Sequence, residues 1–323
     1  RQKSALAVPL SDLIARLFRV PPSVVVTCAR GSSAHAATFA KHLIERRLAI
    51  PVVAAAPVIF TAYHRDLRLK GQLFLVISQS GRSDDLIEAA CSARRSGALL
   101  AAVVNEVKSP LAEVCDIVLP LGAGPERAVA ATKSFIASLA ALLRLVSLWS
   151  GDESLRTAID RLPVRLAEAA KLNWSSAIQA LSTAPSLVVI GRGPTLAIAR
   201  EAALKLKELA GLHSEAFSGA EFLHGPVALV GANYPVLMFV PSDETAPGLR
   251  RLVADLRSRG ANLFCADPAG GISSGLPALP PDHSDADALC LIQSFYKMAA
   301  QLATARGVDP DRPRHLQKIT RTR

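Results

Sequence analysis

Short apolar runs rich in β-branched residues alternate with longer stretches of helical periodicity in the first half of the chain. Continuous apolar runs of this kind, separated by helices, are typical of a parallel sheet that helices cover on both faces. The pattern predicts strands at residues 23–28, 73–77, 99–104 and 116–120, and helices at 32–48 and 84–96.

The same alternation returns in the second half. An apolar strand that runs into a glycine-containing turn and then a helix occurs twice, as VVVTCARGSS at Val24–Ser33 and as LVVIGRGPT at Leu187–Thr195. We therefore predict an α/β fold of two tandem domains, residues 1–150 and 151–323, each a flavodoxin-like three-layer α/β/α sandwich with a parallel sheet. The predicted elements of the second half are strands at 186–190, 235–240, 261–266 and 276–279 and helices at 195–210, 247–259 and 287–305, with long helices at 133–149 and 153–181 between the halves.

The composition fits this fold and excludes several classes of protein. Half of the 323 residues are hydrophobic and 20% are charged, which excludes a disordered chain. The longest apolar run, residues 135–149, contains Arg144 and is shorter than the roughly 20 residues of a membrane-spanning helix. No signal-peptide pattern opens the chain, so neither a membrane protein nor a secreted one is expected.

Cysteine content and charge further restrict the compartment and the partners expected for the protein. The number of cysteines is odd, five in all, and no two of them form a CxxC pair, which indicates a reducing cytoplasm rather than a disulfide framework or a zinc site. The net charge of +10 is spread along the chain without a dense basic run, so nucleic acid is not an expected partner. Ordinary surface charge or a small anionic ligand accounts for the excess of basic residues equally well.

Two polar loops follow predicted strands, at the end of a parallel sheet where ligands bind beside helix N-termini. GSS at Gly31–Ser33 follows the first strand, and its hydroxyls either cap the next helix or donate hydrogen bonds to an anion. SQSGRS at Ser78–Ser83 follows the second, and its hydroxyls, amide and free backbone N–H groups suit a phosphate monoester. No Lys follows in P-loop spacing, so a nucleoside triphosphate site is not indicated.

Two further segments carry candidate chemistry. VAATK opens the long apolar helix after residue 128, where Thr132 either caps the helix or donates to the same anion. Glu201, Lys205 and Glu208 share one face of a predicted helix, either as a solvated ion pair or as part of an acid–base group with the Glu- and His-rich segment that follows.

In this order, the motifs resemble those of the sugar isomerase (SIS) family over nearly the whole chain. The sequence is most similar to the isomerase half of glucosamine-6-phosphate synthases and to stand-alone SIS-type glucosamine-6-phosphate deaminases. The motifs that carry the resemblance are ISQSGRSDDL at Ile77–Leu86, ATKSF at Ala131–Phe135, ALKLKEL at Ala203–Leu209, HSEAFSGAEFLHGP at His213–Pro226 and DPDRPRHLQKIT at Asp309–Thr320.

The resemblance implies two SIS domains, a phosphosugar substrate and a homodimer with shared active sites. We expect no metal, because the substrate amine can act as the electron sink, and no cofactor. The resemblance assigns proton transfer between C1 and C2 to Glu208, with Lys205 beside it, and ring opening to a His224 that comes from the neighbouring subunit. Lys318 matches the tail lysine that forms a Schiff base with the open-chain ketose in the synthase. The candidate substrate-binding residues are Gly31, Ser32, Ser33, Ser78, Gln79, Ser80, Ser83 and Thr132, with Val129 and Ala130 lining the sugar through backbone groups.

The sequence also departs from the family pattern. Arg82 stands where the family often has Glu, and Ser83 where it often has Thr. PSDE at Pro241–Glu244 follows a strand of the second half in place of SQSG, which predicts one phosphosugar site per chain, in the first domain. No amidotransferase half precedes Arg1, so we expect that the chain does not make ammonia from glutamine.

These observations predict a cytoplasmic enzyme that converts glucosamine 6-phosphate into fructose 6-phosphate and ammonia. One alternative is aldose–ketose isomerisation, or deamination of another amino-sugar phosphate, by the same residues. Another is a phosphosugar sensor without catalysis, which has no need of Glu208, His224 or Lys318. Nucleic-acid binding through the basic tail at residues 306–323 is a third.

Overall fold

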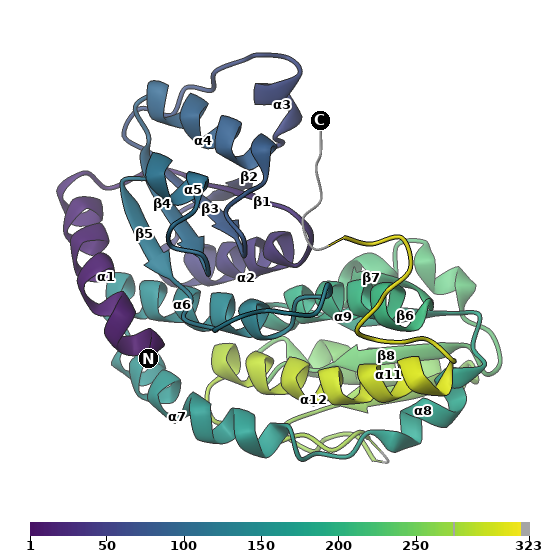
Figure 1. Ribbon diagram of the computed structural model, residues 1–323. Helices are drawn as coiled ribbons and strands as arrows, with labels where there is room; N and C mark the ends of the chain where they lie inside the picture. The colour runs from purple at the N-terminus through teal and green to yellow at the C-terminus, as the bar shows by residue number, and fades with distance from the viewer. Residues whose placement is uncertain (274, 318–323) are drawn as a thin grey trace. The chain divides into compact units, whose positions relative to one another are not determined.

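The computed structural model describes residues 1–273 and 275–317, and the chain divides into two compact units. The first unit comprises Arg1–Arg127 and Ala131–Glu153, and the second comprises Ala128–Ala130 and Ser154–Leu316. Each unit has its own parallel sheet with helices on both faces (Figure 1). The predicted α/β fold of two three-layer sandwiches is therefore confirmed.

The first unit contains a five-stranded parallel sheet in the order β2-β1-β3-β4-β5. Its strands are β1 (Val25–Ala29), β2 (Val52–Ala54), β3 (Leu73–Ser78), β4 (Leu99–Val104) and β5 (Ile117–Pro120). Strand β3 is buried at every residue, as a central strand covered on both faces must be. Helices α1 (Gln2–Arg19), α2 (Gly31–Leu48) and α6 (Lys133–Ser150) pack on one face, and α3 (Val58–Thr61), α4 (Asp84–Arg95) and α5 (Pro110–Val114) on the other.

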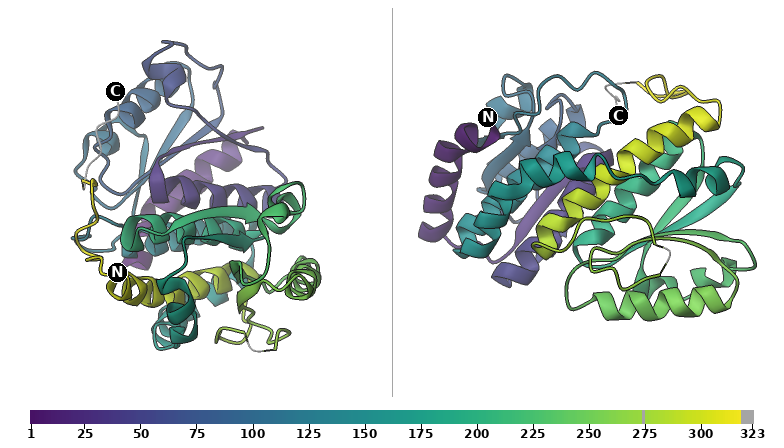
Figure 2. Two further views of the ribbon diagram at one scale, coloured as in Figure 1. Left: turned by 90° about the vertical axis from the view of Figure 1, so that its right-hand side faces the viewer. Right: turned by 90° about the horizontal axis from the view of Figure 1, so that it is seen from below.

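The second unit contains a four-stranded parallel sheet in the order β7-β6-β8-β9. Its strands are β6 (Ser186–Gly191), β7 (His213–Ser218), β8 (Pro235–Phe239) and β9 (Asn262–Ala266). Figure 2 shows α11 (Ala246–Ser258) and α12 (Ser284–Ala305) on opposite sides of this sheet. The remaining helices are α7 (Glu153–Ala169), α8 (Ser175–Ser182), α9 (Pro194–Ala210), the short α10 (Gly219–Phe222) and the 3₁₀ turn η1 (Pro226–Leu229).

Both cores are mainly aliphatic, in line with an aromatic content of only 5%. In the first unit, Phe74 and Val76 of β3 pack against Leu86 and its neighbours on α4. The cysteines Cys28, Cys265 and Cys290 lie in these cores as small apolar side chains. Burial raises the pKa of the Cys28 and Cys265 thiols to about 12, so neither supplies a thiolate at neutral pH.

Several predicted elements differ from the structure. The single helix expected at residues 153–181 is two helices, α7 and α8, and the expected strand at 276–279 is only an isolated bridge from Leu276 to Ala266. The segment HSEAFS, which lies in the Glu- and His-rich region and was not predicted as a strand, is strand β7 at the edge of the second sheet. Helix α1 and strand β2 were not predicted. These differences leave the order of sheet and helix layers unchanged.

Helix α6 is the one helix among the described residues whose length and composition would let it cross a membrane. Of this 18-residue helix, 61% is buried within the structure, and helices at the centre of globular cores pass the same test. Its buried face includes Phe135, Leu139 and Leu142.

Candidate active site

The two predicted serine loops lie at adjacent strand ends in the first unit. Strands β1 and β3 are parallel neighbours, with Ala29 opposite Ile77, so the segments that follow them start side by side. The chain continues from β1 to β2 on one side of it, whereas β3 lies on the other. Ligands of open α/β sheets bind at such a switch point. The structure thus brings Gly31–Ser33 and Ser78–Ser83 to one edge of the sheet.

Helix α2 begins directly in the first of these loops. Gly31 has φ +52°, and the residue at the N-cap is Arg30, whose side chain does not cap the helix. Ser32 and Ser33 therefore lie within the first turn, and the interpretation of this motif as a plain serine N-cap is wrong. The first N–H groups of an 18-residue helix point toward the strand ends, where the helix dipole favours an anion.

The hydroxyls of the second loop shape the loop through backbone N–H groups. Ser78 Oγ accepts from the N–H of Gly81 at 3.1 Å, and Ser80 Oγ accepts from the N–H of Arg82 at 3.3 Å. A serine hydroxyl that accepts a hydrogen bond keeps its own proton for donation. Ser83 is the N-cap residue of α4, and its side chain makes no cap hydrogen bond. The serine hydroxyls of this loop therefore keep protons that they can donate to a ligand.

The neighbouring connection between β4 and α5 holds this loop in place. The carbonyl of Gln79 accepts from Asn105 N–H at 3.2 Å, and that of Gly81 accepts from Leu111 N–H at 3.1 Å. Gly81 has φ +62°, and a Cβ at this position would overlap the Ser109 hydroxyl. Glycine is required here for both reasons.

Arg30 is a charged neighbour of this edge that the sequence interpretation missed. Its Nε and Nη2 lie 2.9 and 2.8 Å from Asp85 Oδ2. Asp85 is buried in the first turn of α4, beside the serine loop, and its carboxylate would oppose an anion there if it were unpaired. The guanidinium offsets that charge. Its position, directly after β1 and next to Gly31, is the signal that the sequence offers for it.

The third predicted segment is organised by a carboxylate that the sequence interpretation also missed. The N-cap of α6 is Thr132, but its side chain makes no cap hydrogen bond, so of its two alternative roles the capping hydrogen bond is wrong. Instead, the buried Glu126 accepts from Thr132 N–H at 3.2 Å and from Ser134 N–H and Oγ at 2.8 and 2.9 Å. Val129 and Ala130 fall in the second unit, just before this helix start.

The second unit contains the predicted acid–base residues on α9. Lys205 Nζ lies 2.5 Å from Glu208 Oε2 and 3.4 Å from Glu201 Oε1, and Tyr296 of α12 donates to Glu201 at 3.3 Å. Glu201 and Lys205 are 0% and 1% exposed, whereas the Glu208 side chain is 21% exposed. A solvated surface pair, the alternative from sequence, is therefore wrong. Only Glu208 of the three offers its carboxylate outward.

Opposite effects act on the buried lysine. Burial lowers the pKa of Lys205, but the carboxylates of Glu201 and Glu208 together outweigh burial, so its pKa is raised. Lys205 is therefore an ammonium at neutral pH. Its charge and its short hydrogen bond fix the position of the Glu208 carboxylate.

Among the described residues, no hydrogen bond or ion pair joins the predicted catalytic residue His224 to this group. His224 is an exposed residue in the turn between α10 and η1. Lys318 lies outside the described residues.

A comparison with protein families identifies the chain. The model of the SIS domain matches residues 22–148 and 180–266, one segment in each half. The chain belongs to the SIS domain family. The predicted resemblance is therefore confirmed, and the two sheets described above are those of two SIS segments.

Relatives of this SIS protein include aminotransferases of sugar metabolism. It is 34% identical over 324 residues to a glutamine–fructose-6-phosphate aminotransferase (isomerizing) from Tropheryma whipplei, a match that covers 94% of this chain and 52% of the relative. The chain thus spans about half the length of the curated relatives it matches.

Solved structures with the same fold cover nearly the whole chain. One, from Silicibacter pomeroyi, is a protein to which phosphosugar isomerase activity has been ascribed; it is 40% identical with a TM-score of 0.89, and the match covers 94% of this chain and 93% of the other. Another is the C-terminal domain of glucosamine-fructose-6-phosphate aminotransferase from Francisella tularensis, 25% identical with a TM-score of 0.82 and 97% coverage of both chains.

Proposed function

We propose that this SIS protein converts glucosamine 6-phosphate and water into fructose 6-phosphate and ammonia. The observation that carries the proposal is the Glu208 carboxylate, held 2.5 Å from a buried ammonium and partly open to solvent. A carboxylate fixed in this way suits the transfer of a proton between neighbouring carbon atoms.

The serine loops would bind the phosphate group of the substrate. The hydroxyls of Ser80 and Ser83 and the first N–H groups of α2 are the donors at this edge of the first sheet. A phosphate monoester is recognised by several short donors at a helix N-terminus. The guanidinium of Arg30 offsets the negative charge of the Asp85 carboxylate, which would otherwise repel the phosphate.

Glu208 would act on the carbon atoms next to the amine. The ring opens to the aldehyde, with His224 of the partner subunit assisting, and Glu208 removes the proton from C2 and returns it at C1. The product is the C2 imine, which water hydrolyses to ammonia and fructose 6-phosphate. A positioned carboxylate contributes typically 10²–10⁴-fold to such a step. Lys318 would form a Schiff base with the open-chain ketose, as the matching lysine does in the synthase.

The burial of the Glu201 and Lys205 charges supports an enzyme rather than a sensor. Removing a carboxylate and an ammonium from water costs several kcal/mol per ion, and their attraction only partly offsets that cost. Stability alone is better supplied by apolar side chains of the same volume. The cluster on α9 therefore indicates a chemical task for Glu208.

Isomerisation of a phosphosugar without release of ammonia is the second candidate. It is favoured by the 40% identity to the Silicibacter pomeroyi protein, to which phosphosugar isomerase activity has been ascribed. The same proton transfer by Glu208 serves both reactions, because each moves a hydrogen between C2 and C1.

One assay distinguishes these functions. The protein is incubated with glucosamine 6-phosphate, and ammonia and fructose 6-phosphate are followed together; equal amounts of both are expected. Interconversion of fructose 6-phosphate and glucose 6-phosphate without ammonia would favour the isomerase, and binding without either product would favour the sensor.

The Glu208→Gln variant tests the role of the carboxylate. We expect kcat to fall by at least about 10²-fold, while the affinity for the phosphosugar is retained. Glu215→Gln is the matched control, because Glu215 is exposed on the adjacent strand β7 and should leave kcat unchanged. Normal turnover by Glu208→Gln would remove Glu208 from the mechanism.

A further inference from the structure

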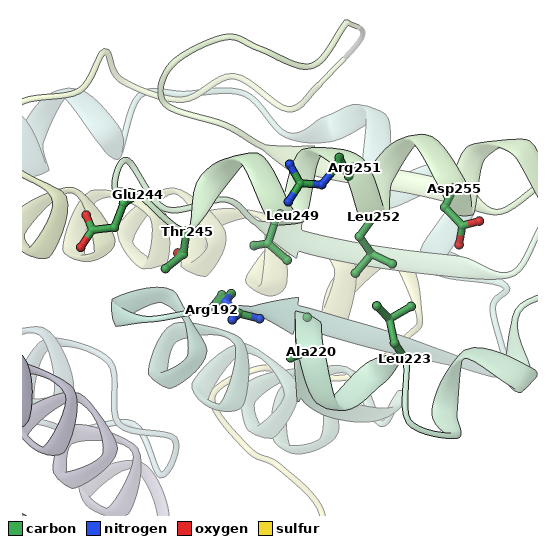
Figure 3. Close-up of a pocket in the computed structure, with 11 residues that line it drawn as sticks. Arg192, Ala220, Leu223, Glu244, Thr245, Leu249, Arg251, Leu252 and Asp255 are labelled. Carbon is green, nitrogen blue, oxygen red and sulfur yellow. The ribbon is translucent and has the colours of Figure 1, made fainter.

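A pocket lies entirely within the second unit, on the side of the sheet that α11 covers (Figure 3). Its volume is about 560 Å³, within the range of roughly 300–1,000 Å³ for small-molecule sites. Leu223, Leu249 and Leu252 form its apolar walls, and four charged side chains lie around it. The charged residues are Arg192, Glu244, Arg251 and Asp255.

This pocket occupies the position in the second sheet that the serine loops occupy in the first. Strands β6 and β8 are parallel neighbours, with Ile190 opposite Met238, and β7 lies on the other side of β6. Arg192 follows β6 directly, and Thr245 follows the end of β8. The pocket therefore lies at the switch point of its sheet, where open α/β sheets bind ligands.

The charges available in the pocket favour an anion. Asp255 is paired with Arg259, at 2.9 Å between Oδ2 and Nε, but no carboxylate in the described part of the chain pairs with the guanidinium of Arg192 or Arg251. Arginine binds phosphate through two parallel hydrogen bonds. The hydroxyl of Thr245 and the carboxylate of Glu244 are suited to the hydroxyl groups of a sugar.

We propose that this pocket is a second ligand site, which binds a phosphorylated hexose or hexosamine through Arg192 and Arg251. The leucine walls would contact the C–H face of the sugar, and the two guanidiniums its phosphate. The pocket lining contains no buried ammonium–carboxylate cluster like that of α9, so the ligand is bound and not turned over. The proposal goes beyond the proposed function and replaces the single site per chain predicted from the absence of SQSG.

The number of sites per chain tests this proposal. All titrations use the Glu208→Gln background, in which bound substrate persists, and isothermal titration calorimetry with glucosamine 6-phosphate and with fructose 6-phosphate. We expect two sites per chain. Adding Arg192→Gln should weaken one of them at least 10-fold and leave the other unchanged, whereas adding Ser80→Ala should weaken only the other.

Two further variants distinguish the effect of the arginine charges from the effect of the open volume of the pocket. Gly248 lines the pocket on α11, and a Cβ there would have only Arg251 Nη2 near it, at 3.9 Å, so Gly248→Leu fills the pocket without crowding the core. It should remove the second site while all arginines remain. Arg257→Gln is the control for Arg251→Gln, because Arg257 is also exposed on α11 but is not part of the pocket lining.

The possible results distinguish this site from the first. A single site that Ser80→Ala weakens and that neither Arg192→Gln nor Gly248→Leu changes would overturn the second site and leave the proposed function intact. A single site that Arg192→Gln weakens and Ser80→Ala does not would support the second site and contradict the phosphate position in the proposed function. No binding of either sugar would overturn the second site, and the ammonia assay then decides the proposed function on its own.

Discussion

Lys205 is the residue on which the geometry of the acid–base group depends most. Its ammonium is buried between the carboxylates of Glu201 and Glu208, and Tyr296 supplies Glu201 with a further hydrogen bond. Because a buried charge is tolerated only with partners, each member of this group restricts the others to one arrangement. The position of the partly exposed Glu208 carboxylate is thereby fixed by buried side chains.

Replacing this lysine should therefore destabilise the whole second unit. Lys205→Met keeps the length of the side chain but removes the ammonium that faces the buried Glu201 carboxylate, and we expect a loss of about 3–5 kcal/mol in the free energy of unfolding. Urea denaturation measures it. Lys207→Met is the matched control, since Lys207 is exposed two residues further along the same helix. A loss equal to that of the control would show that the buried pair contributes little.

At the residue scale the sequence identified polar groups but not their partners. The serines of both loops and the three charged residues of α9 were found because they follow strands or share a helix face. Two partners were missed: Arg30, which pairs with Asp85, and Glu126, which accepts from Ser134. Each pair joins residues that only the folded chain brings together. The burial of Glu201 was missed for the same reason, as helical spacing does not say which face a tertiary neighbour covers.

At the element scale, the start of α6 depends on a residue outside the helix. Glu126 lies six residues before the N-cap and satisfies N–H groups that the Thr132 side chain does not. A helix end without such an acceptor leaves several backbone donors unpaired. The carboxylate also suits the positive end of the helix dipole.

Exchange of Glu126 should destabilise the first unit more than exchange of the N-cap residue. Glu126→Ala removes the acceptor for two backbone donors and the Ser134 hydroxyl, and we expect a loss of about 1–3 kcal/mol in unfolding free energy. Thr132→Ala should change it by less than about 0.5 kcal/mol, because no cap hydrogen bond is lost. The two variants are compared by urea denaturation. The reverse order would show that the threonine hydroxyl caps the helix after all.

The connection between α7 and the segment before α12 should respond to acid. Arg161 of α7 donates to Asp282 at 2.6 and 3.0 Å, and this hydrogen bond holds the pKa of Asp282 below its ordinary value. A depressed carboxyl pKa adds stability above the ordinary value, and this stability is lost as the pH falls through the depressed one. Arg161→Gln should therefore reduce stability modestly at pH 7 and not at the acid end. Thermal unfolding of Asp282→Asn, which has no titrating carboxyl, should lack this pH dependence.

Element prediction from sequence succeeded where one face or both faces of an element are apolar. Strands buried at all or nearly all residues, such as β3 and β4, were found. Strand β7 was not, because an edge strand alternates polar residues such as His213 and Glu215 outward. Helix α1 has buried leucines at helical spacing, from Leu6 to Leu17, but Pro9 within it is unusual for a helix. Such elements are fixed by tertiary neighbours more than by their own pattern.

At the scale of the whole molecule, the second sheet repeats the order of the first four strands of the first sheet, with different side chains at the switch point. The first sheet presents serines and helix N–H groups there, and the second presents arginines around a leucine-walled pocket. Because both use the same strand-end geometry, the repeat explains why a second ligand position exists at all. Because the pocket edge of the second sheet carries arginines in place of serines, a search for the SQSG motif alone does not find this second ligand position.

The expected homodimer gives the last prediction, since the resemblance to the synthase places His224 of the partner subunit at each active site. Two variants that are each inactive, Glu208→Gln and His224→Ala, are co-expressed with different tags, and the mixed dimers are isolated through both tags. A symmetric dimer of this kind has one site with both residues intact and one with neither. We therefore expect about half of the wild-type kcat per dimer in the ammonia assay, with the size of the dimer verified by light scattering. If His224 instead served the site of its own chain, every site in the mixed dimer would lack one residue and no activity would return.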